Sequence, residues 1–132
     1  MSDDLRVVDP VTQVELVVPV YGTPERAIRR AALAREGLIR TIRFYPDWPH
    51  LWPFWGEKGE VSAEDLGLSE SLQEDLRRWF EKWNATFRYD TGWPTAATGE
   101  AWMSVGDDLV YRVQQEVWDF ADVRAEHRGF QT

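Results

Sequence analysis

Histidine and cysteine carry out much of the proton-transfer and nucleophilic chemistry of proteins, and this sequence has two histidines and no cysteine. His50 follows Asp47 by three residues, and a nearby carboxylate can hold an imidazole in one tautomer for general acid–base catalysis. His127 lies near the C-terminus, in a segment that we expect to fray. The absence of cysteine excludes disulfides and thiolate metal ligands.

Closely spaced carboxylates are the other candidates for chemistry. Asp107 and Asp108 are adjacent, and Asp119 and Asp122 lie three residues apart, so each pair could attract a cation. Paired carboxylates on a helix or an edge strand are usually solvated, however, and the sequence has no HExxH, phosphate-binding glycine loop, EF-hand or nucleophile elbow. We therefore predict no catalytic centre, no metal site and no cofactor.

The charge of the chain is unevenly distributed. Residues 1–45 hold seven Lys/Arg and six Asp/Glu, whereas residues 46–132 hold eight and seventeen, and the net charge is −8. An acidic body repels phosphate backbones and speeds encounter with basic partners, although many acidic surfaces serve solubility alone. This distribution favours a basic protein as partner over a nucleic acid.

The hydrophobic pattern and the turn residues predict an α+β fold. We expect a small sheet of about three strands, two long amphipathic helices packed on one of its faces, and a shorter N-terminal helix. Thr23 and Ser69 are suitable N-caps for two of these helices. The expected elements are strands at 14–20, 40–46 and 117–124, and helices at 23–37, 69–87 and 96–116.

The helix over 69–87 has the clearest apolar stripe, which places Trp79 and Trp83 in the core. In the helix over 96–116, Gly106 lies within the apolar stripe, where close approach of another backbone would account for it. Tyr111 lies on the polar face of the same helix, beside Asp107 and Asp108.

A segment rich in tryptophan and proline spans residues 44–55. Proline favours extended conformations in itself and in the residue before it, so this segment should form a stiff crossing. We expect Trp52 and Trp55 to close the core beneath the helix over 69–87. Trp48, Asp47 and His50 should then form an exposed surface.

We expect residues 1–132 to form a single domain of ordinary size. Residues 1–38 are a strand–helix extension, residues 39–124 are the main body, and residues 125–132 are a flexible tail. The sequence shows neither a signal peptide nor an apolar run of about 20 residues, which indicates a cytoplasmic protein.

Residues 40–124 contain an ordered set of tryptophan, glycine and leucine motifs. Its members are Trp52-Pro53-Phe54-Trp55, Gly59, Val61, Leu66-Gly67-Leu68-Ser69, Leu72, Leu76, Trp79, Gly92-Trp93, Trp102, Gly106 and Leu109. In this order of motifs the chain resembles a group of small, acidic, tryptophan-rich proteins of actinobacteria that have no established activity. The resemblance implies the fold rather than a catalytic residue, and such proteins are similar in character to immunity proteins and antitoxins.

We therefore expect a non-enzymatic protein-interaction domain of immunity or antitoxin type, with a basic protein as its partner. Aromatic anchors beside acidic charge are typical of interaction surfaces. One contact face should contain Asp107, Asp108, Tyr111 and Asp119, and a second should contain Trp48 with Asp47 and His50.

Two alternatives remain open. A nucleic-acid-associated regulator would use the arginine face of the N-terminal helix, although the acidic body opposes it. A carbohydrate-binding module would stack sugar rings on exposed tryptophans. The residues concerned are Arg26, Arg29, Arg30 and Arg35 in the first case, and Trp48, Trp52 and Trp55 in the second.

Overall fold

A computed structural model describes residues 5–130 of the chain. The helices are α1 (Pro24–Arg35), α2 (Glu70–Thr86) and α3 (Ala96–Val117), and a 3-10 helix, η1 (His127–Phe130), follows the last strand. The strands are β1 (Leu5–Val8), β2 (Glu15–Val18), β3 (Arg40–Phe44), β4 (Phe54–Gly56), β5 (Gly59–Glu60) and β6 (Ala121–Ala125). Within the described part of the chain, none of the helices combines the length and the apolar character needed to span a bilayer.

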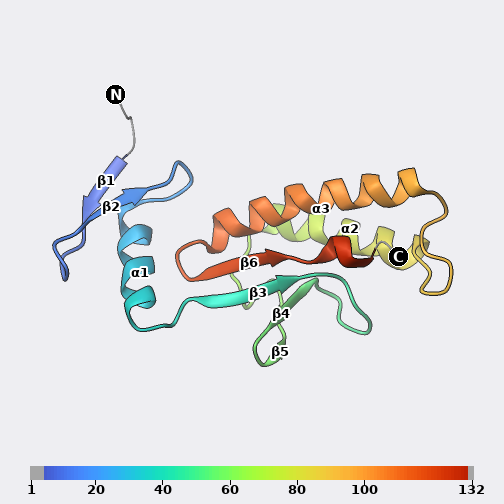
Figure 1. The fold of residues 1–132 in the computed structure, drawn as a ribbon, viewed down its shortest axis with the longest axis horizontal. Coiled ribbons are helices and arrows are strands. Elements are labelled where there is room, and N and C mark those ends of the chain that lie inside the picture. The colour runs from blue at the N-terminus through green and yellow to red at the C-terminus, as the bar shows by residue number, and fades with distance from the viewer. Residues whose placement is uncertain (1–4, 131–132) are drawn as a thin grey trace.

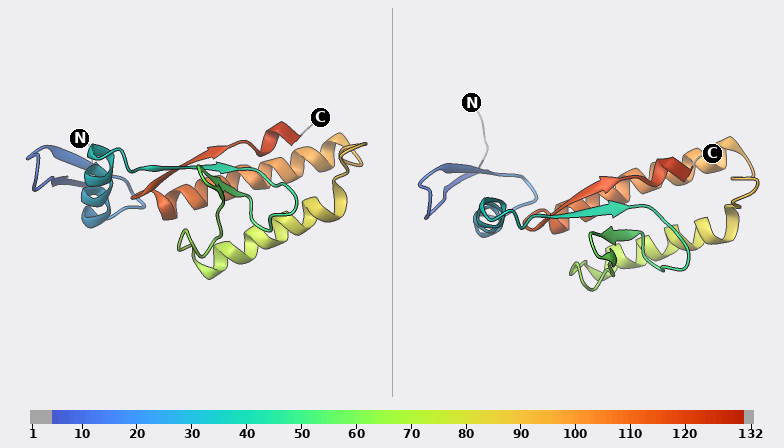
Figure 2. Two further views of the ribbon diagram at one scale, coloured as in Figure 1. Left: turned by 90° about the horizontal axis from the view of Figure 1, so that it is seen from below. Right: turned by 60° about the horizontal axis from the view of Figure 1, so that its bottom comes forward.

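The main sheet has four strands in the order β5-β4-β3-β6. β3 pairs in parallel with β6, from Arg40 opposite Ala121 to Phe44 opposite Ala125. Parallel neighbours need a long crossover connection, and here the β4–β5 hairpin, α2 and α3 lie within it. Figure 2 shows α2 and α3 side by side on one face of this sheet. The predicted α+β class is therefore confirmed, with four strands in the main sheet.

Capping side chains determine where the helices begin. Ser69 Oγ accepts a hydrogen bond from the Leu72 amide, and Thr95 Oγ1 accepts one from the Thr98 amide. Thr23 caps α1 in the same way, through the amide of Arg26. Each bond satisfies an amide that has no partner within its own helix. The predicted starts of all three helices are confirmed.

The core lies between the main sheet and the two long helices. Trp79 and Trp83 are buried, as predicted, at 3% and 1% exposure. Trp52 packs against this core and stacks on Phe54. Trp55 instead stacks on Tyr45, at 5.4 Å between ring centroids, so it does not close the core beneath α2 as we expected.

Two of the predicted strands differ from the structure. β2 does not join the main sheet, because it pairs with β1 in a separate two-stranded sheet. The last strand begins at Ala121 rather than at residue 117. α3 continues through Val117, and a turn closed by the Phe120 amide on the Val117 carbonyl then precedes the strand.

The C-terminal segment is folded rather than frayed as far as residue 130, and residues 131–132 lie outside the described part. The side chain of His127 is fully buried, with Nε2 3.1 Å from the Met103 carbonyl. A Cβ at Gly106 would lie 2.7 Å from the His127 ring and 2.8 Å from the Trp79 ring. Gly106 is therefore required by two aromatic side chains, and our expectation of a neighbouring backbone was wrong.

We predict that Trp83→Ala lowers the free energy of unfolding by about 3–5 kcal/mol, because it empties a buried aromatic site. Trp48→Ala is the matched control, since Trp48 is 57% exposed, and it should cost less than about 1 kcal/mol. Urea denaturation followed by circular dichroism measures both values. Similar losses for the two variants would contradict this assignment of the core.

Candidate partner-binding site

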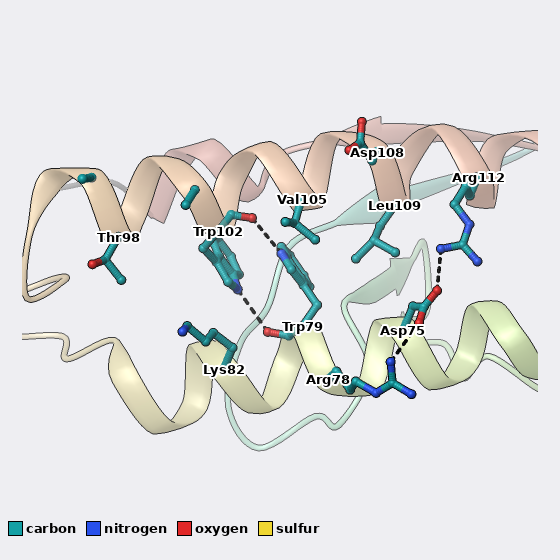
Figure 3. A pocket seen from close by; sticks show the side chains of 12 residues that line it. Asp75, Arg78, Trp79, Lys82, Thr98, Trp102, Val105, Asp108, Leu109 and Arg112 are labelled. Carbon is teal, nitrogen blue, oxygen red and sulfur yellow. Dashed lines mark hydrogen bonds and ion pairs between the residues drawn. The ribbon is translucent and has the colours of Figure 1, made fainter.

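An open groove runs between α2 and α3 on the side that faces away from the sheet, with a volume of about 810 Å³ (Figure 3). Large hollows with apolar walls and a few polar groups are the usual places where proteins bind other molecules. The groove is lined by Asp75, Arg78, Trp79, Lys82, Ala97, Thr98, Ala101, Trp102, Val105, Asp108, Leu109 and Arg112.

The floor of the groove is made rigid by a pair of tryptophans. The indole rings of Trp79 and Trp102 stack with centroids 4.1 Å apart and planes 7° apart. Trp79 Nε1 donates to the Trp102 carbonyl at 2.9 Å, and Trp102 Nε1 donates to the Trp79 carbonyl at 3.0 Å. Since both indole donors are satisfied inside the protein, the pair presents an apolar floor with a fixed shape.

The rim of the groove holds both paired and unpaired charges. Asp75 accepts from Arg112 at 2.7 Å and from Arg78 at 3.4 Å. The side chains of Lys82 and Asp108, in contrast, have neither a hydrogen bond nor an ion pair with any residue among 5–130. A partner can therefore bring an apolar group to the floor and a charge of each sign to the rim.

Val105 adds exposed apolar surface to the edge of the groove. The residue falls within the apolar spacing of α3, yet it is 50% exposed. α3 packs on α2 along one side and on β6 along another, which leaves Val105 over the open groove. No local signal in the sequence marked this exposure, because Val105 fits the apolar stripe of α3. The predicted contact faces did not include Val105, Lys82 or Arg112.

Three of the four residues predicted for the first contact face do lie on the outer surface of α3. Asp108 and Tyr111 are exposed, Tyr111 by 61%. Asp107 is also exposed but is held by Arg128, and its Oδ1 lies 2.9 Å from His127 Nε2. The hydrogen bond from the Arg128 guanidinium lowers the pKa of the Asp107 carboxyl.

Asp119, the fourth predicted residue, is not part of that face. Its side chain is buried, with 7% exposure for the residue, and it lies between two arginines of α1. Arg26 Nε donates to Asp119 Oδ1 at 3.0 Å, and Arg29 donates to Oδ2 at 2.9 Å. The prediction was wrong because Asp119 lies in the turn after α3, where the N-terminal extension covers it.

The arginines of α1 have structural partners, which weakens the nucleic-acid alternative. Arg26 also donates to the carbonyls of Gln115 and Glu116 at the C-terminal end of α3. Arg30 donates to the Trp118 carbonyl and to Asp122. A positive charge at a helix C-terminus is favourable to the helix dipole, so these guanidinium groups attach the extension to the body.

Trp48 and Asp47 form a second surface at the C-terminal end of α2. Trp48 is exposed, and its Nε1 donates to Asn84 Oδ1 at 2.8 Å. Tyr89 donates to Asp47 Oδ1 at 2.9 Å. Burial and this hydrogen bond raise the pKa of the Tyr89 phenol, which keeps it a donor. Two exposed aromatic rings are thereby held in fixed positions.

His50 does not belong to this second surface. Its side chain is 10% exposed, and Nε2 lies 2.9 Å from the Val61 carbonyl. The residue therefore connects the tryptophan/proline segment to the loop after β5. The Asp47 carboxylate instead accepts from the Trp48 amide and the Tyr89 phenol. The expected exposure of His50 was wrong, and Asp47 and His50 have different hydrogen-bond partners in the described part of the chain.

The carbohydrate alternative required three exposed tryptophans on one platform. Trp52 stacks on Phe54 and has the Arg77 guanidinium 5.7 Å from its ring centroid. Trp55 stacks on Tyr45. Trp48 is the one member of the three that is exposed, so the predicted platform is not formed. Residues 5–130 also contain no group of three or more His, Asp or Glu side chains able to hold a metal ion.

We predict that Arg128→Met raises the pKa of Asp107 toward its ordinary value of 3.8, because the variant removes the hydrogen bond that lowers it. In the folded wild type this carboxylate stabilises the fold above its unfolded pKa, and the contribution is lost as the pH falls through the lower folded pKa. A carboxyl ¹³C NMR titration measures the shift. Arg124→Met is the control, and an equal change in that variant would contradict the assignment.

Similarity to known proteins identifies the family of the chain. No curated protein matches it. A family model described as "Serratia CdiI immunity protein-like" matches residues 40–124, which extend from the start of β3 into β6. This match covers more than half of the sequence and includes the groove between α2 and α3, so the chain belongs to the Serratia CdiI immunity protein-like family.

Proposed function

We propose that this protein is an immunity protein that binds a toxin protein and blocks it without catalysing a reaction. The observation that carries the proposal is the family match over residues 40–124, which includes both long helices and most of the main sheet. Inhibition by binding requires a complementary surface rather than a poised nucleophile or a metal. The groove and the outer surface of α3 offer such a surface.

The charge of the chain supports a basic toxin as the partner. The net charge is −8, and the excess of acidic residues lies within 46–132, the region that contains the groove. Long-range attraction between an acidic inhibitor and a basic target raises the rate of association. An immunity protein benefits from this rate because it must capture the toxin before the toxin acts.

The contact surface that we propose extends from the groove across the outer side of α3. Val105 supplies exposed apolar area above the tryptophan floor, and Asp108 supplies an unpaired charge at the rim. Tyr111 lies one helical turn from Asp108 and exposes most of its ring. Rigid aromatic groups at the centre of an interface frequently contribute most of the binding free energy.

The experiment uses this chain purified together with the protein encoded beside its gene. We expect a one-to-one complex in which Asp108→Lys increases Kd by about 10- to 100-fold, which corresponds to about 1.4–2.7 kcal/mol. Tyr111→Ala should act mainly through faster dissociation, as is usual for interface mutations. Surface plasmon resonance at two salt concentrations separates the association and dissociation rates.

Glu64→Lys is the matched control, because it produces the same change in net charge on an exposed residue outside the groove. It should slow association slightly and leave dissociation unchanged. If Glu64→Lys weakens the complex as much as Asp108→Lys does, the effect is one of total charge and the proposed surface is wrong. Catalytic turnover of a toxin substrate by this chain alone would contradict the proposal of inhibition by binding.

A further inference from the structure

The N-terminal unit, defined here as residues 5–35, has more apolar surface than its own core can cover. Of its hydrophobic side chains, Val18 and Ala27 are buried, and neither belongs to the core cluster beneath α2 and α3. Figure 1 shows the unit standing at one end of the main body. A two-stranded sheet is marginally stable unless a hydrophobic face is covered, and a unit of this size cannot supply a full core.

Part of the uncovered surface lies on the outer face of the β1–β2 hairpin. Side chains alternate between the two faces of a strand, and Val18 points toward α1. Val8 and Val17 therefore lie on the opposite face, where they are 53% and 50% exposed. Arg6 and Glu15 share that face, and their charged groups approach to 3.8 Å.

The register of the hairpin places these four side chains at the corners of a rectangle. Arg6 pairs with Val17 and Val8 pairs with Glu15, so the two valines occupy one diagonal and the two charges occupy the other. Consider two hairpins packed face to face, with a two-fold axis that lies between them along the valine diagonal. Each valine then meets the same valine of the second copy, and Arg6 of each copy meets Glu15 of the other. The strands then cross at about 70°, which is close to the orthogonal geometry of sheet packing.

The charges of the N-terminal unit favour a second copy of this chain over a basic toxin. Glu25 is the one charged side chain among residues 5–35 that lacks an ion pair in the described structure. Two copies with a net charge of −8 each repel one another over their acidic bodies. The neutral hairpin face is a surface on which two such chains can approach, whereas a basic partner is drawn to the acidic region.

We propose that the outer face of the β1–β2 hairpin is a self-association surface, through which two copies of this chain form a symmetric dimer. The contact is isologous, because the same four side chains of each copy meet across the axis. The contact uses no residue of the α2–α3 groove, since no residue of the hairpin lines the groove. The proposal does not depend on the identity of a toxin.

The test is the molar mass of the full chain, measured by sedimentation equilibrium at rising concentration. The wild type should move from 15.4 kDa toward twice that value between about 5 and 500 µM, a range suited to a small contact. The double variant Val8→Asp with Val17→Asp should remain monomeric over this range. Val105→Asp is the matched control, because Val105 is equally exposed but lies in the groove, and it should dimerise as the wild type does.

Charge exchange tests the symmetry of the contact independently of folding. Arg6→Glu should raise the dimer Kd at least about 5-fold, because two like charges then meet at each end of the contact. Arg6→Glu combined with Glu15→Arg should restore the wild-type Kd, and circular dichroism should be unchanged in both. A wild type that stays at 15.4 kDa throughout would overturn the proposal. Dimerisation that Val105→Asp abolishes and the hairpin variants retain would also overturn it.

Discussion

The structure depends on the mutual hydrogen bonds of Trp79 and Trp102. An indole N–H that is buried without an acceptor costs free energy, and each of these donors finds its acceptor in the backbone of the opposite helix. The bonds fix both the distance and the rotation of α2 relative to α3. They also bring the two rings into contact, and this stacked pair forms the floor of the groove. The site is therefore a consequence of how the helices are joined.

The Trp79–Trp102 pair also explains why position 106 is a glycine and why the C-terminal segment is folded against the body. Trp79 can stack on Trp102 because position 106 has no side chain, and the space left there is shared with the imidazole of His127. His127 Nε2 faces two acceptors, the Met103 carbonyl and Asp107, so it must carry the proton when the ring is neutral. Asp107 is thereby held in place from inside the protein, while Arg128 holds it from outside.

The sequence was sufficient to predict the helices, because their caps and apolar stripes are local signals. Ser69 and the stripe through Trp83 lie within one element, and no distant residue can alter them. The sheet was harder to predict. Nothing local distinguishes a strand that joins β3 from one that forms its own hairpin, and β2 was assigned to the wrong sheet for this reason.

The candidate site shows the same division between local and distant information. Tyr111 was predicted to be exposed from the helix that contains it, and it is exposed. Asp119 was predicted from an alternating pattern, but its environment is decided by arginines about 90 residues earlier in the chain. The burial of His127 likewise depends on contacts with aromatic rings of α2, α3 and β3. Contacts of this kind cannot be inferred from spacing along one segment.

The structural body of the protein is longer than the family match. The match ends at residue 124, yet Glu126 pairs with Arg43 of β3, and the two residues that follow hold Asp107. Asp107 lies within the match, next to the rim of the groove, so its position depends on residues outside it. The C-terminal residues pack into the body, whereas the N-terminal unit does not share its core. The unit is attached through ion pairs and ring contacts at the end of α3. The chain thus combines a family body completed by its C-terminal residues with an N-terminal unit that leaves the groove open.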